Sequence, residues 1–233
     1  MKSGKSTGDD GISLKMCKLS LPVILPHIVC LINLIIKTGI FPDTWKTARV
    51  SPIFKSGDMT DLNNYRPISV LCFFSKIYEK HLSTEMKRFM EENSVLNQKQ
   101  YGFKAKNSTT DALLSIQKEI CSARDSKNYV CLIAIDLKKA FDLINHKILA
   151  QKLLKYGFVK VINHIISYLK GRKQYIKFGN IKSIIKFLKN ISVPQGSILG
   201  PLLFLIYIND IFELEIEGLM CLFADDLSLV IQH

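Results

Sequence analysis

The stretch Leu222-Phe-Ala-Asp-Asp-Leu227 places two adjacent carboxylates, Asp225 and Asp226, between two apolar runs. The runs predict the strands of a hairpin, at 219–223 and 227–231, with both carboxylates at its tip. Another apolar run, over 130–135, is typical of a central buried strand, and it ends on Asp136. Carboxylates at these two places could hold two divalent metal ions, which stabilise both the attacking and the leaving oxygen of a nucleotidyl transfer.

The composition predicts a folded protein with a polyanionic partner. The 233 residues can bury a sizeable core, as one large domain or two interlocked lobes, and an apolar content of 48% excludes intrinsic disorder. The formal net charge of +12 favours nucleic acid as the partner. A Lys-rich, AT-biased genome is the alternative source of this charge, so charge alone identifies no function.

Six cysteines are scattered along the chain, and none forms a Cys-x-x-Cys pair. Several lie in apolar runs, where cysteine packs as a small hydrophobic residue. We therefore expect a reduced intracellular protein without a zinc site.

The apolar run from Leu19 to Ile36 raises the question of a membrane helix. Because proline is favoured in the first turn of a helix, Pro26 predicts a helix over about 24–37 that ends at Gly39. This helix is too short to span a bilayer, and no small-residue cleavage site of a signal peptide follows it. We expect a buried core helix and no stable membrane association.

Helices and strands alternate through the remaining chain without a repeat, which indicates a mixed α/β or α+β class. A turn and a strand are expected over 41–54, and a hairpin over 174–188. Apolar residues at helical spacing cover 68–93 and 201–211, and the segment 147–169 predicts two helices separated at Gly157. The capping box Ser108-Thr-Thr-Asp111 predicts a helix that extends to about Arg124.

Four motifs follow one another along the chain: Tyr65-Arg-Pro-Ile-Ser-Val-Leu71, Ala134-Ile-Asp-Leu-Lys-Lys-Ala-Phe-Asp142, Val193-Pro-Gln-Gly-Ser-Ile-Leu-Gly-Pro-Leu-Leu-Phe204 and Phe223-Ala-Asp-Asp226. In this order they resemble the motifs of reverse transcriptases. Tyr156-Gly-Phe158, Tyr168-Leu-Lys-Gly-Arg172 and Tyr207-Ile-Asn-Asp210 resemble the jockey-type branch of the non-LTR (LINE-like) retrotransposons. The resemblance covers about 38–233 and implies an α+β right-hand polymerase fold, with fingers and a ferredoxin-like palm that contains an antiparallel sheet.

The resemblance implies a magnesium site at the carboxylates. Asp136 and Asp225 would ligate two Mg²⁺ ions, Asp226 would lie beside them, and the carbonyl of Leu137 would complete the shell of one ion. Magnesium suits hard oxygen ligands that it shares with substrate phosphates, and Mn²⁺ could replace it. The nucleophile would be the 3′-hydroxyl of a primer, so no nucleophilic side chain is expected.

The resemblance also implies a nucleotide site. Phe141 takes the place of the aromatic residue that blocks a ribose 2′-hydroxyl, with a plain core phenylalanine as the alternative. Gln195 and Gly196 would pack under the incoming nucleotide and the template base, unless they form a simple turn after Pro194. Arg66 and Lys55 would grip the triphosphate, since guanidinium and ammonium groups both bind phosphate, although a solvated loop charge is the alternative for Lys55.

Three basic residues are candidates for contact with nucleic acid. Lys104 would face the template backbone, and Arg172 and Lys173 could contact phosphates, with ordinary surface charge as the alternative. The resemblance divides the chain into an N-terminal extension and helix (1–37), mainly fingers with the start of the palm (38–128), and palm (129–233), with a fingers-like helical insertion at about 145–188. Because the chain ends soon after Asp226, we expect a truncated palm and no thumb.

We therefore expect an RNA-directed DNA polymerase that adds dNTPs to the 3′-hydroxyl of a DNA primer on an RNA template. It would act in the nucleus or the cytoplasm, without an obligate protein partner. The alternative is a catalytically silent retroelement remnant that at most binds nucleic acid.

Overall fold

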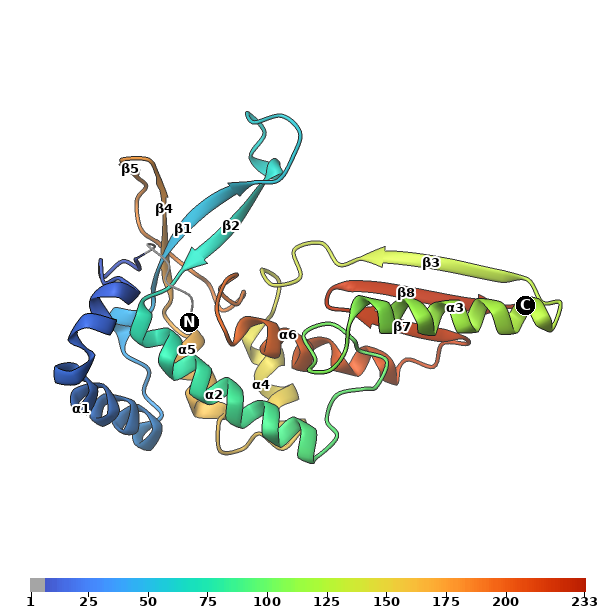
Figure 1. Ribbon diagram of the computed structural model, residues 1–233, viewed down its shortest axis with the longest axis horizontal. Helices are drawn as coiled ribbons and strands as arrows, with labels where there is room; N and C mark the ends of the chain where they lie inside the picture. Colours follow the sequence, from blue (N-terminus) through green and yellow to red (C-terminus); the bar gives the residue numbers. More distant parts are fainter. Residues whose placement is uncertain (1–6) are drawn as a thin grey trace. The chain divides into compact units, whose positions relative to one another are not determined.

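The computed structural model describes residues 7–233, and residues 1–6 of the predicted N-terminal extension lie outside this range. The chain forms two compact units, each built from two separate pieces of sequence (Figure 1). The first unit comprises Met1–Met86 and Phe141–Gly200, and the second comprises Lys87–Ala140 and Pro201–His233.

Helix α1 (Leu14–Thr38) begins the described part of the first unit. The side chain of Ser13 accepts a hydrogen bond from the N–H of Met16 at its start. Gly39, with φ of 70°, ends the helix by donating its N–H to the carbonyl of Ile35. The predicted end at Gly39 is confirmed, but the predicted start near Ile24 is wrong, because the helix continues through both Pro22 and Pro26.

The prediction that this helix is buried is also wrong, because Cys17 and Ile35 are its only buried residues. Within the described residues, α1 is the one helix long and apolar enough to cross a membrane by length and composition. Only 6% of its most apolar window is buried. The spacing of apolar residues shows that a helix forms here, but it does not show which surface covers it.

The sheet of the first unit is centred on β1 (Thr47–Phe54). This strand follows a short 3₁₀ turn, η1 (Asp43–Trp45), and pairs antiparallel with β2 (Tyr65–Val70) after a second turn, η2 (Leu62–Asn64). On its other side β1 pairs parallel with β4 (Lys173–Phe178). The short strands β5 (Ile181–Lys182) and β6 (Lys186–Phe187) both pair with β4.

The predicted strand before residue 54 and the predicted hairpin over 174–188 are confirmed. The prediction of a helix from residue 68 is wrong at its start, because 68–70 belong to β2 and α2 (Phe73–Glu92) begins after them. Pairing with β1 overrides the helical spacing there. The two helices α4 (His146–Lys155) and α5 (Ile162–Leu169) form as predicted, with Gly157 at φ of 86° between them.

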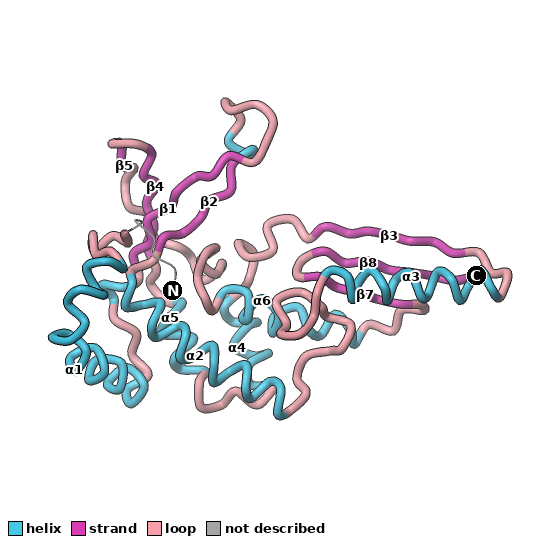
Figure 2. Tube along the Cα trace, in the orientation of Figure 1, coloured by secondary structure: helices cyan, strands magenta, loops and turns pink. Residues whose placement is uncertain are grey.

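The second unit contains an antiparallel sheet in the order β3-β8-β7 (Figure 2). Its strands are β3 (Val130–Asp136), β7 (Leu219–Phe223) and β8 (Asp226–Gln232), so the predicted hairpin is confirmed. Helix α3 (Thr109–Asp125) lies along one face, where Gln232 donates a 2.6 Å hydrogen bond to Glu119. The predicted capping box between Ser108 and Asp111 starts this helix.

The opposite face of this sheet packs against α6 (Gly200–Ile208) and the 3₁₀ segment η3 (Asn209–Glu213). Met220, Leu222, Leu227 and Leu229 form a buried cluster on this face. The prediction that the strand before Asp136 is central and buried is wrong, because β3 is an edge strand and most of its side chains are exposed. β8 takes the central place, since it pairs on both sides.

Candidate active site

The acidic residues singled out in the sequence lie at the same end of the second unit's sheet. Asp136, the last residue of β3, lies directly opposite Asp226, the first residue of β8. Opposed residues in an antiparallel pair have Cα atoms about 4.5–5.5 Å apart and project from the same face. Asp225 precedes Asp226 in the turn, so the backbone places three acidic residues from two distant parts of the sequence at one end of the sheet.

Ala224 and Asp225 form a two-residue turn, since Phe223 pairs with Asp226. Ala224 has φ of 58°, whereas Asp225 does not have a positive φ, and this pattern is typical of a type II′ turn, in which glycine usually takes the first place. A left-handed φ costs a non-glycine residue roughly 1–2 kcal/mol. The turn that carries Asp225 is therefore strained and depends on the surrounding structure.

The donor set at this site consists of oxygen atoms, the ligands that Mg²⁺ and Mn²⁺ prefer. Asp136 and Asp226 are exposed and Asp225 is half-buried. Leu137, whose carbonyl was predicted as a ligand, directly follows β3. Over residues 7–233, no three His, Cys, Asp or Glu side chains lie closely enough together to form a ready-made metal site. The chemistry of the residues thus fits a hard cation, whereas the side chains do not converge on one point.

The first unit holds the residues predicted to bind the nucleotide. Lys55 directly follows β1, and its N–H donates to the carbonyl of Asn64 at the end of the β1–β2 hairpin. Arg66 lies on β2 opposite Ile53, so Lys55 and Arg66 are diagonal neighbours on the same face of the hairpin. Both side chains are exposed. Two cations on one exposed face are an arrangement that can bind a triphosphate.

A chain of backbone hydrogen bonds joins the other nucleotide-site candidates to this hairpin. The N–H of Val193 donates to the carbonyl of Phe141, at 2.9 Å, and the N–H of Ser69 on β2 donates to the carbonyl of Gln195, at 2.7 Å. Gly196 has φ of 109°, and a Cβ there would lie 2.8 Å from the carbonyl oxygen of Ser69. The first unit therefore gathers Phe141, the Gln195–Gly196 loop and β2.

The three basic candidates differ in exposure. Arg172 is only 1% exposed, donates to the carbonyl of Tyr168 and packs over the ring of that tyrosine. Because its guanidinium is buried, Arg172 cannot reach the phosphates of a bound nucleic acid as predicted, and it acts as an internal cation. Lys173 is half-buried with its ammonium group over the ring of Phe187. Lys104, in the second unit, donates to the carbonyl of Asn97, and burial lowers its pKa.

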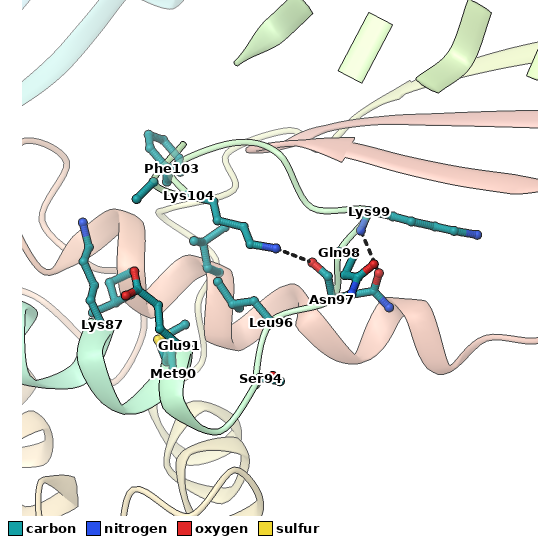
Figure 3. Close-up of a pocket in the computed structure, with 13 residues that line it drawn as sticks. Lys87, Met90, Glu91, Ser94, Leu96, Asn97, Gln98, Lys99, Phe103 and Lys104 are labelled. Carbon is teal, nitrogen blue, oxygen red and sulfur yellow. Dashed lines mark hydrogen bonds between the residues drawn. The ribbon is translucent and has the colours of Figure 1, made fainter. Parts of the chain in front are cut away.

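Lys104 lines a cavity of about 660 Å³ in the second unit (Figure 3). The residues that line the cavity include the apolar Met90 and Leu205 and the cations Lys87 and Lys99. The 94–105 loop forms one side of the cavity, and it also reaches the strand that leads to Asp225.

Three residues of functional interest gave no signal in the sequence. Gln100 and Gly102 contact the turn that carries Asp225. Glu79 lies on α2, fully buried, and accepts hydrogen bonds from the hydroxyl of Ser75 and from the N–H of Ile198, both at 2.7 Å. Sequence spacing could not reveal their contacts with Ala224 and Ile198, because these two residues lie far away in the chain.

The sequence is similar to those of known polymerases. A family model described as "Reverse transcriptase (RNA-dependent DNA polymerase)" matches residues 53–233. The chain belongs to the reverse transcriptase family. The matched range contains every predicted site residue of both units.

The relatives of this reverse transcriptase domain are retrotransposon polymerases. The chain is 31% identical over 235 residues to the probable RNA-directed DNA polymerase from transposon BS of Drosophila melanogaster, covering 97% of this chain and 26% of that protein. It is 28% identical over 238 residues to the RNA-directed DNA polymerase from mobile element jockey of Drosophila funebris, covering 99% and 26%. The chain thus spans about a quarter of the length of the curated relatives it matches.

These matches cover nearly the whole chain, so α1 belongs to the part that is shared with the relatives. The predicted resemblance to jockey-type, non-LTR elements is confirmed.

Solved structures show the same fold. An apo telomerase from Candida Tropicalis, truncated from its C-terminal domain, matches 82% of this chain and 45% of its own, with a TM-score of 0.53 and 14% identity. A telomerase from the same organism in complex with a fragment of telomeric RNA matches 81% and 36%, with a TM-score of 0.56 and 12% identity. At this identity the likeness concerns the polymerase fold alone.

Proposed function

We propose that this chain is the catalytic part of an RNA-directed DNA polymerase that adds dNTPs to a primer 3′-hydroxyl. The observation that carries this proposal is the register of β3 and β8, which places Asp136 opposite Asp226 with Asp225 in the adjoining turn. Polymerases of this family generally use divalent metals. The proposed partners are an RNA template and a DNA primer, inside the nucleus or the cytoplasm.

Asp136, Asp225 and Asp226, with the carbonyl of Leu137, would hold two Mg²⁺ ions, and Mn²⁺ would also fit their oxygen atoms. When bound, such a pair of ions lowers the pKa of the primer hydroxyl and stabilises the charge on the leaving pyrophosphate. The exposed end of the sheet leaves room for a primer terminus beside the carboxylates. The primer supplies the nucleophile, so these residues need only bind and orient.

The first unit would bind the incoming dNTP. Arg66 offers a planar fork to phosphate oxygens and Lys55 a point charge, both on the exposed face of the β1–β2 hairpin. Phe141 would pack against the sugar, and Gln195 with Gly196 would form the surface under the base pair. In this proposal 38–128 are mainly fingers and 129–233 are palm, so each unit combines segments of both.

A catalytically silent remnant that binds nucleic acid is the second candidate. It is favoured by the net charge of +12 and by the absence, across the described part of the chain, of three ligands gathered for a metal. Such a remnant would bind RNA or DNA through exposed lysines and would not extend a primer.

Primer extension on an RNA template with Mg²⁺ tests the first function. Asp225→Asn keeps the shape of the side chain and removes its charge, so we expect extension to fall by about 10³-fold, equivalent to roughly 4 kcal/mol. Chelation of the metal should abolish extension. Asp125→Asn, at the exposed end of α3, is the matched control and should retain the parent rate. Salt-sensitive binding without any extension by the parent chain would instead support the remnant.

A further inference from the structure

The segment 99–101 is hydrogen-bonded to the strand that leads into the Ala224–Asp225 turn. The N–H of Leu222 donates to the carbonyl of Lys99, at 3.0 Å, and the N–H of Tyr101 donates to the carbonyl of Leu222, at 2.8 Å. These bonds form a parallel bridge between Gln100 and Leu222 on the outer edge of β7. The bridge fixes the segment beside the Ala224–Asp225 turn, and the side chain of the bridged residue, Gln100, reaches that turn.

The side chain of Gln100 bonds to both backbone polar groups of Ala224. It is 1% exposed. Its Oε1 accepts the N–H of Ala224, at 3.3 Å, and that of Gly102, at 2.9 Å, while Nε2 donates to the carbonyl of Ala224, at 3.5 Å. That carbonyl belongs to the peptide bond between Ala224 and Asp225. A buried amide with all these bonds fixes the peptide that precedes the catalytic candidate.

Gly102 lets the segment approach the turn closely. Its φ is not in the left-handed region, so the need for glycine here is one of space. A Cβ at this position would collide with the backbone nitrogen of Ala224 and would lie 2.7 Å from its Cα and 2.8 Å from the carbonyl carbon of Phe223. Since the obstacles are backbone atoms, the turn itself would have to move.

We propose that Gln100 and Gly102 are positioning residues for nucleotidyl transfer: they clamp the Ala224 peptide and thereby set the place of the Asp225 carboxylate. This inference rests on the proposed polymerase function. Ala224 is 8% exposed and holds a φ of 58° that alanine disfavours, so the turn needs an external support. The clamp supplies that support from a part of the sequence 124 positions away.

Gln100→Ala tests the clamp, with the exposed neighbour Gln98→Ala as the matched control. In primer extension we expect kcat to fall about 10–100-fold in Gln100→Ala, because a small misplacement of a catalytic group costs this much. The KM for dNTP and the Kd for primer–template should stay at the parent values, since the clamp contacts neither. Gln98→Ala should match the parent in all three quantities.

Two readouts do not depend on turnover. Hydrogen exchange at the Ala224 amide should be faster in Gln100→Ala, because its acceptor is gone, and Mn²⁺ binding measured by calorimetry should be weaker. Gln100→Glu keeps the length and an accepting oxygen but loses the Nε2 donor, so an intermediate effect is expected. If Gln100→Ala does not fold, Gln100→Glu and Gly102→Ala carry the same test, the latter through the collision with the turn.

The outcomes separate the clamp from the polymerase function. A parent chain that binds Mn²⁺ but never extends a primer would refute the function, and loss of Ala224 protection and of Mn²⁺ affinity in Gln100→Ala would still support the clamp. Unchanged Ala224 exchange, Mn²⁺ affinity and kcat in a folded Gln100→Ala variant would overturn the clamp.

Discussion

At the scale of single residues, Phe141 is expected to decide which sugar the chain accepts. Its carbonyl is bonded to Val193, two residues before the proposed nucleotide loop. Phe141→Ala should therefore raise ribonucleotide incorporation, relative to dNTP, by about 10–100-fold, because space opens for a 2′-hydroxyl. Competing rNTP and dNTP in a primer-extension assay measure this ratio, and the exposed Phe178→Ala is the control. Unchanged sugar selectivity in Phe141→Ala would assign that side chain to the core.

Single residues also differ in whether the sequence alone can identify them. The placement of Asp136 and Asp225 at strand ends could be predicted, because each stands at the end of an apolar run that forms a strand. Gln100 and Glu79 could not, because a buried polar residue is recognised by its partners, and these lie 124 and 119 positions away. Arg172 reads as a surface cation in the sequence, yet it is buried beside Tyr168.

At the scale of elements, α2 holds the loop before α6 through the carboxylate of Glu79. Burial raises the pKa of Glu79 above the ordinary value of 4.5, against the opposing effects of its hydrogen bonds and of Arg172. Between these two pKa values the folded chain binds more protons than the unfolded chain. The free energy of unfolding contributed by Glu79 therefore rises as pH falls from above its folded pKa toward 4.5.

Urea unfolding at several pH values between 8 and 5 checks this expectation. Glu79→Gln cannot titrate, so the parent should gain stability relative to Glu79→Gln as pH falls, while the exposed Glu217→Gln should follow the parent. Parallel pH profiles for the parent and Glu79→Gln would contradict the raised pKa. A full truncation, Glu79→Ala, should cost about 1–3 kcal/mol, because it leaves the Ser75 hydroxyl and the Ile198 N–H without their acceptor.

Element boundaries divide into those fixed by local chemistry and those fixed by contacts. The capping box of α3 and the glycines at 39 and 157 could be located from the sequence, since each acts within one turn. The start of α2 could not be located from the sequence, because pairing of β2 with β1 overrides the helical spacing over 68–70. The exposure of α1 and β3 could not be predicted from the sequence. An apolar run indicates a surface that can be buried, but it does not identify the element that would cover it.

At the scale of the whole molecule, the order of the elements and motifs predicts a polymerase fold, and the family match and the likeness to telomerase structures confirm that much. The division into two units, each made from two pieces of chain, was not foreseeable in detail. Helices α2 and α6 both contain a boundary between the units, and no composition shift marks a helix that passes from one unit to another.

The net charge of +12 has two possible sources, a surface that binds nucleic acid or the composition of a Lys-rich genome, and salt dependence distinguishes them. If basic residues neutralise phosphates, the logarithm of the binding constant should fall linearly with the logarithm of salt concentration, by about 0.7–0.9 for each phosphate contact. With 6–10 contacts, affinity for a primer–RNA template should drop about 10³–10⁵-fold between roughly 50 and 200 mM salt.

Lys104→Ala should reduce this slope by about 1, because one phosphate partner is lost, while Lys118→Ala on the exposed side of α3 should leave it unchanged. Fluorescence anisotropy of a labelled primer–template over a salt series measures both slopes. A shallow slope in the parent would mean that the lysines reflect composition and do not form a binding surface. An equal reduction in both variants would mean that binding depends on total charge, with no particular place for Lys104 beside the template.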